Sequence, residues 1–343
     1  MISHLTELFP VLLVSLVSAL LASPLVMKFC DAAGLIDLPD SAPHKQHTIP
    51  TPLAGGIVIT LAIALTYVVI RPYADKTSLG ILLGGGVLLI WGIVDDRFGL
   101  KPFPKILGQV VVAGILIFFG IQVKMTRIEG LDLLITFIWI VGLINAFNFV
   151  DSMDGLAVGL AGIAAAFFML VTIDAVQPSL AVLAATIVGA SIGTFFMNAP
   201  PARLFLGDSG AQVLGFLLAA VGLAYIPAQA GLDQGVSWFI PILVMGVPIF
   251  DTTLVVVSRA RRGQRVTQAG RDHTYHRLLL LGLDSTRAVL LMQLAGILLG
   301  FIAFIALDTT VLIANAIFVS IIILGLFSLG MLERIYSAST KES

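Results

Sequence analysis

Acidic residues close an apolar segment near the first third of this chain. Asp95 and Asp96 are adjacent at the end of the run "LLIWGIVDDRFG" (88–99). Two adjacent carboxylates repel each other and are costly next to hydrocarbon, so cations must lie beside them. Carboxylate and amide oxygens are typical ligands of Mg²⁺ and Mn²⁺, whereas zinc favours thiolates and imidazoles. The pair therefore indicates a hard divalent cation, together with neighbouring Lys and Arg side chains.

Further polar clusters lie at the ends of other apolar segments. They read "HKQHTIPTPLAGG" (44–56), "NAFNFVDSMDG" (145–155), "FLGDSG" (205–210) and "SRARRGQRVTQAGRDHTYHR" (258–277). In addition, Asp251 falls inside an apolar segment, where an ionisable group is a candidate functional residue by default. Lys, Arg and His around an acidic core suit a phosphate group bound next to a metal ion. The residues alone thus predict phosphoryl transfer at one face of a membrane.

Each cluster also has a simpler structural interpretation. The pair Asp95 and Asp96 could be a solvated helix end, and Asp151 or Asp208 could cap the helix that follows it. The arginine run 259–271 could be only a signal for membrane orientation. These alternatives stay open residue by residue, but they do not explain why every unusual carboxylate falls on one face.

The composition places these clusters in an all-α polytopic membrane protein. Hydrophobic residues make up 58% of the 343 residues and charged residues 11%, against about 45–50% and about 25% in soluble domains. A net charge of −1 argues against a nucleic-acid partner. We expect a single integral membrane domain over residues 1–343.

Eleven apolar segments are long enough to be membrane spans. They cover about 9–28, 52–70, 77–94, 104–121, 133–150, 155–173, 179–197, 210–228, 236–257, 287–307 and 311–332. With eleven spans, fifteen of the 19 Lys and Arg residues fall on the side that holds the polar clusters. The positive-inside rule then predicts an outside N-terminus, an inside C-terminus and a site at the cytoplasmic face of the cell membrane.

The order and spacing of the motifs resemble one enzyme superfamily, the polyprenyl-phosphate N-acetylhexosamine-1-phosphate transferases. The motifs read "GLIDLPDSAPHKQHTIPTPLAGG" (34–56), "GIVDDRFGLKPFPKILGQ" (92–109), "NAFNFVDSMDGLAVG" (145–159), "FLGDSGAQVLGF" (205–216), "VPIFDTTLVVVSR" (247–259) and "DHTYHRLL" (272–279). The resemblance implies that a polyprenyl phosphate attacks the β-phosphate of a UDP-N-acetylhexosamine, UMP leaves, and a polyprenyl-diphospho-sugar stays in the membrane. It also implies a Mg²⁺ cofactor, for which Mn²⁺ is a substitute.

Position within the motifs implies a role for each candidate residue. Asp95, Asp96 and Asp251 match the catalytic aspartates, and Asn148 and Asp251 match the magnesium ligands. The residues that match substrate-binding positions are Lys45, His47, Lys105, Asp151, Asp154, Asp208, His273, His276 and Arg277. One position departs from the family, because Tyr275 stands where members often carry a histidine.

The exact reaction has several alternatives. The arginine-rich segment before His273 looks closer to the UDP-GlcNAc branch, and the pathway would be lipopolysaccharide or teichoic-acid assembly. A phospho-MurNAc-pentapeptide translocase is the alternative within the superfamily. A transporter with carboxylates inside its spans is an alternative of another class, whereas the DG-x₂-AR signature of CDP-alcohol phosphotransferases is absent. The sequence leaves open whether the protein is a homodimer.

Overall fold

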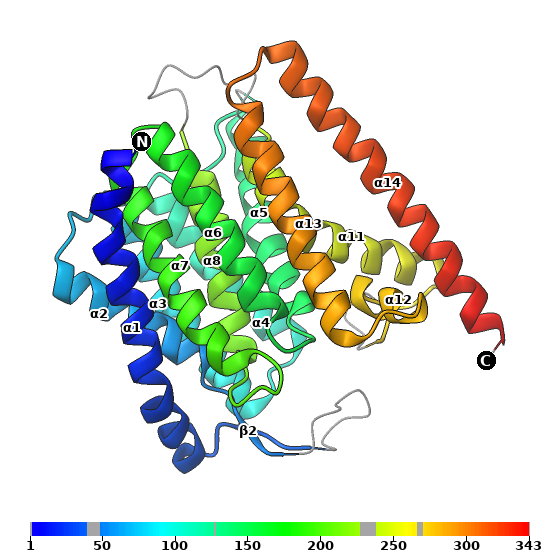
Figure 1. Cartoon of the computed structure of the whole chain (residues 1–343), viewed down its shortest axis with the longest axis horizontal. Helices are drawn as coiled ribbons and strands as arrows, with labels where there is room; N and C mark the ends of the chain where they lie inside the picture. The colour runs from blue at the N-terminus through cyan, green and yellow to red at the C-terminus, as the bar shows by residue number, and fades with distance from the viewer. Residues whose placement is uncertain (1, 40–48, 127, 227–237, 266–269, 343) are drawn as a thin grey trace.

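The computed structural model is a bundle of helices (Figure 1). It describes residues 2–39, 49–126, 128–226, 238–265 and 270–342. The helices are α1 (Ile2–Ala33), α2 (Gly55–Ile70), α3 (Lys76–Phe98), α4 (Pro102–Phe118), α5 (Glu129–Val150), α6 (Leu156–Asp174), α7 (Pro178–Asn198), α8 (Gly207–Ala224), α10 (Ile240–Val244), α11 (Gly246–Arg261), α12 (Thr274–Leu280), α13 (Ser285–Ala306) and α14 (Val311–Glu342).

Eight of the described helices are long and apolar enough to cross a membrane, namely α1, α3, α5, α6, α7, α8, α13 and α14. The protein is therefore a multi-pass membrane protein of the all-α class, as predicted. Helices α2 and α4 are apolar but shorter. The segment predicted as one span over 236–257 is broken at Met245, which separates α10 from α11. The count of eleven spans remains a prediction.

Helix α8 is the centre of the bundle. Helices α3, α5, α2 and α6 pack around it, and α1 and α6 both pack on α7. Most of α8 is buried inside the protein, whereas α14 exposes almost its whole apolar length. Because lipid is as apolar as these side chains, such exposure is ordinary for a peripheral membrane helix. The fully enclosed α8 can instead present its N-terminus to a site within the bundle.

A pair of short strands brings residues of the first motif, 34–56, against the start of α8. Strand β1 (Ile36–Asp37) pairs antiparallel with β2 (Thr51–Pro52), and Leu53 forms a parallel bridge with Phe205. Residues 205–216 and 34–56 are thus joined by backbone hydrogen bonds at the same end of the bundle.

Candidate active site

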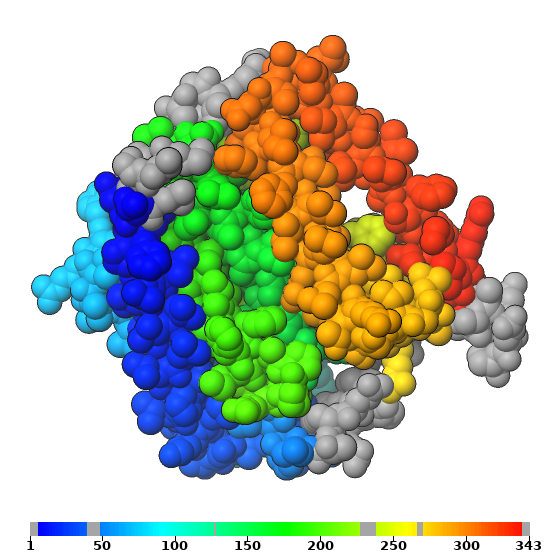
Figure 2. Space-filling view, in the orientation of Figure 1, coloured from blue at the N-terminus to red at the C-terminus, as the bar shows by residue number. Residues whose placement is uncertain are grey.

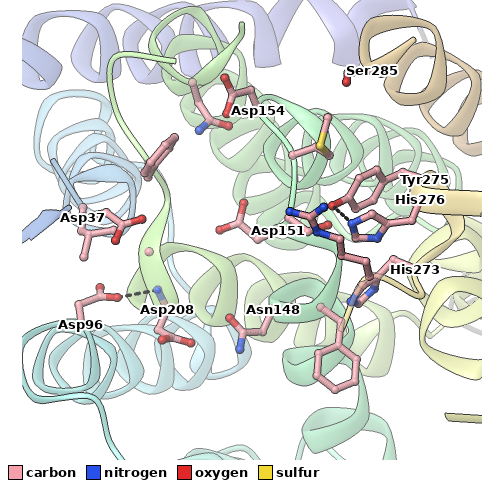
Figure 3. A pocket seen from close by; sticks show the side chains of 18 of the residues that line it. Asp37, Asp96, Asn148, Asp151, Asp154, Asp208, His273, Tyr275, His276 and Ser285 are labelled. Atoms are coloured by element: carbon pink, nitrogen blue, oxygen red, sulfur yellow. Dashed lines mark hydrogen bonds between the residues drawn. The ribbon is translucent and has the colours of Figure 1, made fainter. Parts of the chain in front are cut away.

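The polar clusters meet at a cavity of about 880 Å³ between helix ends. The ends of α3, α5 and α7 and the starts of α8 and α13 line it, together with α12. Figure 3 shows acidic side chains on one side and His273, Tyr275 and His276 on the other. The carboxylates that line the cavity are Asp37, Asp95, Asp96, Asp151, Asp154 and Asp208. The cavity therefore has an acidic wall and a second wall of arginine, histidine and tyrosine side chains.

Asp96 binds the backbone at the start of α8. Its Oδ1 accepts a hydrogen bond from the Asp208 N–H at 2.7 Å, and its Oδ2 accepts one from the Ser209 N–H at 3.1 Å. The first N–H groups of a helix have no partner within the helix, and they carry the positive end of its dipole. The carboxylate of Asp96 thus satisfies two of these groups and fixes the end of α3 to the start of α8.

Asp95 turns to a different partner, because successive residues of a helix point about 100° apart. Its Oδ1 accepts from the Leu100 N–H at 2.8 Å. Its Oδ2 lies 2.8 Å from Lys105 Nζ, and the same Nζ lies 3.1 Å from Asp208 Oδ2. The repulsion expected between Asp95 and Asp96 is therefore offset by Lys105 on one side and by the N-terminus of α8 on the other.

Glycines allow the backbones around the start of α8 to touch. Gly92 of α3 packs on Ser209, and Gly56 of α2 packs on Gly210, in each case too closely for a side chain. Gly207 has a φ of 69°, which favours glycine, and a Cβ there would collide with the Asp96 carboxylate. The acidic wall is consequently held by contacts between backbones.

The loop between α5 and α6 carries Asp151 and Asp154. Burial, followed by the charges of Asp208, Asp96 and Asp154, raises the pKa of Asp151 to about 8. Asp154 Oδ2 accepts from the Ala202 N–H at 3.1 Å, which ties this loop to the one after α7. No side chain caps α6, and the side chain of Asp208 binds Lys105. The capping alternative is thus not observed for Asp151 or for Asp208.

Asp251 lies behind the cavity wall and holds His273. Its Oδ2 is 2.9 Å from His273 Nδ1, and its Oδ1 accepts from the Thr274 N–H at 2.6 Å. The carboxylate is buried, while His273 lines the cavity. Asp251 therefore fixes the orientation of the imidazole in this structure. Its predicted role as a metal ligand stays a prediction.

Tyr275 and His276 form an uncharged pair in the same wall. The Tyr275 hydroxyl is 2.6 Å from His276 Nε2 (Figure 3). Burial, followed by the electrostatic effects of His273 and Arg271, lowers the pKa of His276 to about 4, and burial raises the pKa of Tyr275 to about 12. At neutral pH the pair can donate or accept hydrogen bonds but carries no charge. The departure at Tyr275 thus supplies a partner for His276.

Arg277 lies away from the cavity, whereas Asp251 and Lys105, which do not line it either, each contact a residue that does. The Arg277 side chain is fully buried and points to α14, where Nη1 is 2.6 Å from Glu333 Oε2. The reason is helical geometry, since neighbouring residues of α12 face different directions. Arg259 and Arg271 line the cavity instead. Both belong to the arginine run 259–271, which the charge count alone explains as an orientation signal. No feature of the sequence therefore marks these two arginines as residues of the site. Lys45 and His47 lie outside the described residues.

The donor atoms of the acidic wall fit a hard cation. Among the described residues, no three His, Cys, Asp or Glu side chains form a ready metal cage. Mg²⁺ does not require one, because it usually takes one or two carboxylates and keeps water and substrate phosphates as its other ligands. Asn148 and the neighbouring carboxylates supply oxygen donors at the cavity surface (Figure 3). The oxygen donors of the acidic wall are thus compatible with Mg²⁺.

Comparison with known proteins places the chain in a family. The model of glycosyl transferase family 4 matches residues 78–226. The decaprenyl-phosphate N-acetylglucosaminephosphotransferase of Mycolicibacterium smegmatis is 31% identical over 301 residues, which cover 77% of this chain and 73% of that protein. The chain belongs to glycosyl transferase family 4. The family resemblance expected from the motifs is therefore confirmed.

Two further relatives of the family extend the similarity. A Bacillus subtilis protein named "Probable undecaprenyl-phosphate N-acetylglucosaminyl 1-phosphate transferase" is 28% identical over 344 residues, covering 96% of this chain and 94% of the relative. The undecaprenyl-phosphate alpha-N-acetylglucosaminyl 1-phosphate transferase of Escherichia coli K12 is 27% identical over 297 residues, covering 81% and 78%. The Bacillus alignment spans nearly the whole chain, beyond the 78–226 segment that the family model matches.

Proposed function

We propose that the protein transfers N-acetylglucosamine-1-phosphate from UDP-GlcNAc to a polyprenyl phosphate, releasing UMP. The product, a polyprenyl-diphospho-GlcNAc, would remain in the membrane as the first lipid intermediate of a cell-envelope glycan. The names of the three relatives support this choice of sugar and lipid. Neither the phospho-MurNAc-pentapeptide reaction nor transport has comparable support.

The observation that carries the proposal is the two-sided cavity at the helix ends. Two phosphate groups must approach each other in this reaction, and both are anionic. The wall with Arg259, Arg271 and His273 suits the diphosphate of the nucleotide sugar, because charge-assisted hydrogen bonds bind phosphate oxygens strongly. The acidic wall suits a divalent cation. Bound Mg²⁺ would neutralise charge on the reacting phosphates. Asn148 lines the cavity and is one proposed ligand; Asp251, the other proposed ligand, would have to exchange its contact with His273 for the metal ion.

In this mechanism the protein mainly positions and neutralises its substrates. An oxygen of the polyprenyl phosphate forms a bond to the β-phosphorus, and the bond from that phosphorus to the bridging oxygen breaks, so that UMP leaves. A phosphate at neutral pH needs little help from a base, so Asp95 and Asp96 act by fixing Lys105 and the start of α8. Arg259, held by Asp272, offers its cationic side chain at the cavity wall.

We further propose that the cavity faces the cytoplasm, in the cytoplasmic membrane. The fifteen Lys and Arg residues assigned to that side support this orientation. The N-terminus would then lie outside and the C-terminus inside. Figure 1 is compatible with this, since α1 begins and α14 ends at opposite ends of the bundle.

A transfer assay with purified protein tests the proposal. The protein is incubated with Mg²⁺, undecaprenyl phosphate and one radiolabelled donor at a time: UDP-GlcNAc, UDP-GalNAc or UDP-MurNAc-pentapeptide. We expect labelled lipid from UDP-GlcNAc, no label without the lipid acceptor, and loss of label with EDTA. Label only from UDP-MurNAc-pentapeptide would favour the translocase reaction, and solute flux in vesicles without any transfer would favour a transporter.

A further inference from the structure

A buried ion pair joins the last helix to the segment that carries the cavity histidines. Arg277 Nη1 on α12 lies 2.6 Å from Glu333 Oε2 on α14. The Arg277 side chain is fully buried, and that of Glu333 is 4% exposed. The same guanidinium donates from Nε to the Asp272 carbonyl oxygen at 3.0 Å. One side chain thus connects α14, α12 and the residue directly before His273.

The surroundings extend this connection to the cavity wall. The Asp272 carboxylate accepts two hydrogen bonds from Arg259, at 2.9 and 2.7 Å, and one from Arg262 at 2.6 Å. Burial opposes the charge of Asp272, but the hydrogen bonds and charge of Arg259, followed by the hydrogen bond from Arg262, lower its pKa to about 2. The guanidinium carbons of Arg277 and Arg262 lie 4.7 and 5.0 Å from the ring centre of Tyr336. Asp272, Arg277 and Tyr336 each contact at least two other members of the network, and Glu333 joins it through Arg277.

Helix α14 has few other attachments. Its central apolar stretch is almost wholly exposed, and it contacts α11, α12 and α13. Figure 2 shows an opening between α14 and the rest of the molecule along the middle of the helix, with contact towards its two ends. The end that carries Glu333 is attached through the ion-pair network and the buried Leu332, while the exposed middle of the helix adds little.

We propose that Glu333 is a positioning residue for sugar-phosphate transfer, acting through Arg277 on the orientation of His273 and His276. The inference rests on the proposed function and adds a residue that no motif contains. Helix α12 has only seven residues, too few to hold its own orientation. Three tethers fix it, namely Asp251 with His273 and Thr274, Asp272 with the two arginines, and Glu333 with Arg277.

The consequence for catalysis depends on which wall of the cavity α12 forms. His273 and His276 line the cavity wall proposed to face the diphosphate, whereas Asp96 and Asp208 on the acidic wall belong to α3 and α8. Loss of the contact between Glu333 and Arg277 should displace only the wall that carries His273 and His276. A displacement of about 1 Å of the groups that bind the diphosphate can lower kcat/KM for the nucleotide sugar by about 100-fold.

The first test compares Glu333→Gln with Arg334→Gln, its exposed and charged neighbour on the same helix. For Glu333→Gln we expect kcat/KM for UDP-GlcNAc to fall by about 10- to 100-fold, mainly through a raised KM. The KM for undecaprenyl phosphate should change by less than about twofold, and Arg334→Gln should match the wild type. A lower kcat with both KM values unchanged would mean fewer folded molecules and would overturn the inference, as would unchanged kinetics.

A second variant separates positioning from stability. Replacing both partners, Arg277→Met with Glu333→Met, removes the cost of an unpaired buried charge, and such apolar replacements are often neutral for stability. We expect a melting temperature close to that of the wild type but a KM for UDP-GlcNAc still raised by about tenfold. If KM returns to the wild-type value together with stability, the pair is only structural. A wild-type protein that transfers no sugar phosphate would refute the proposed function instead, so the two failures are distinguishable.

Discussion

Replacing Lys105 by Met should leave the carboxylates of Asp95 and Asp208 to repel each other without a neutralising ammonium group. Lys105 Nζ lies 2.8 Å from Asp95 Oδ2 and 3.1 Å from Asp208 Oδ2, so these two oxygens are at most about 5.9 Å apart. With an effective dielectric constant of about 20, two unit charges at that separation repel by about 3 kcal/mol. The unfolding entropy of a chain of 343 residues is about 0.7 kcal/mol/K, so the melting temperature should fall by about 4 °C.

The assay is thermal unfolding in detergent with a chelator present, so that no divalent cation replaces the lost ammonium group. The variant Lys101→Met, on an exposed lysine one turn away, is the control and should change stability by less than about 0.5 kcal/mol. Adding Asp208→Asn to Lys105→Met should recover most of the loss, because one of the two repelling charges disappears. If the two substitutions have independent, additive effects, Lys105 does not neutralise this pair and our account of the acidic wall is wrong.

Three further predictions concern other parts of the site. Asp251→Asn should reduce transfer at least 100-fold without loss of insertion, because the charge behind His273 disappears; near-normal activity at saturating Mg²⁺ would exclude Asp251 from the site. The pKa of Asp151 is about 8 in the folded protein and about 3.9 when unfolded, so without ligands the free energy of unfolding decreases as the pH rises from about 4 to about 8. Asp151→Asn should therefore raise the melting temperature more at pH 8 than at pH 5, and an equal rise would contradict the shift. In a background with Cys30 replaced, an impermeant thiol reagent applied from outside should label a cysteine at Asp174 but not at Gly263; the reverse pattern would overturn the orientation.

The sequence predicts the helical class and most of the site because both depend on local chemistry. Apolar length marks α1, α3 and α5 to α8, and the carboxylates at their ends identify the wall of the cavity. Hydropathy cannot detect the break at Met245, because apolar residues continue through it and the prolines at 241 and 248 lie early in α10 and α11, where they are tolerated. The number of membrane crossings therefore does not follow from composition.

The partners of individual side chains are the part that the sequence does not supply. Asp95 and Asp96 are neighbours in the chain, yet they bind Lys105 and the start of α8 respectively. Arg277 follows His276 directly, yet only His276 lines the cavity. Glu333 lies 56 residues beyond Arg277 in an ordinary apolar helix. A motif gives residue types and spacing along the chain, whereas these pairings depend on how separate helices are rotated against each other.

The backbone contacts around the start of α8 have a consequence for binding. Gly56, Gly92 and Gly207 bring three segments together without side chains that can change rotamer, and Asp96 closes the junction. The acidic wall is thus preorganised, since its conformational entropy is lost during folding and not when substrates arrive. Immobilising a flexible side chain on binding costs about 0.5–1.5 kcal/mol, and this wall avoids much of that cost. An alanine at Gly92 would displace the start of α8, and the wall would then have to be ordered when the substrates bind.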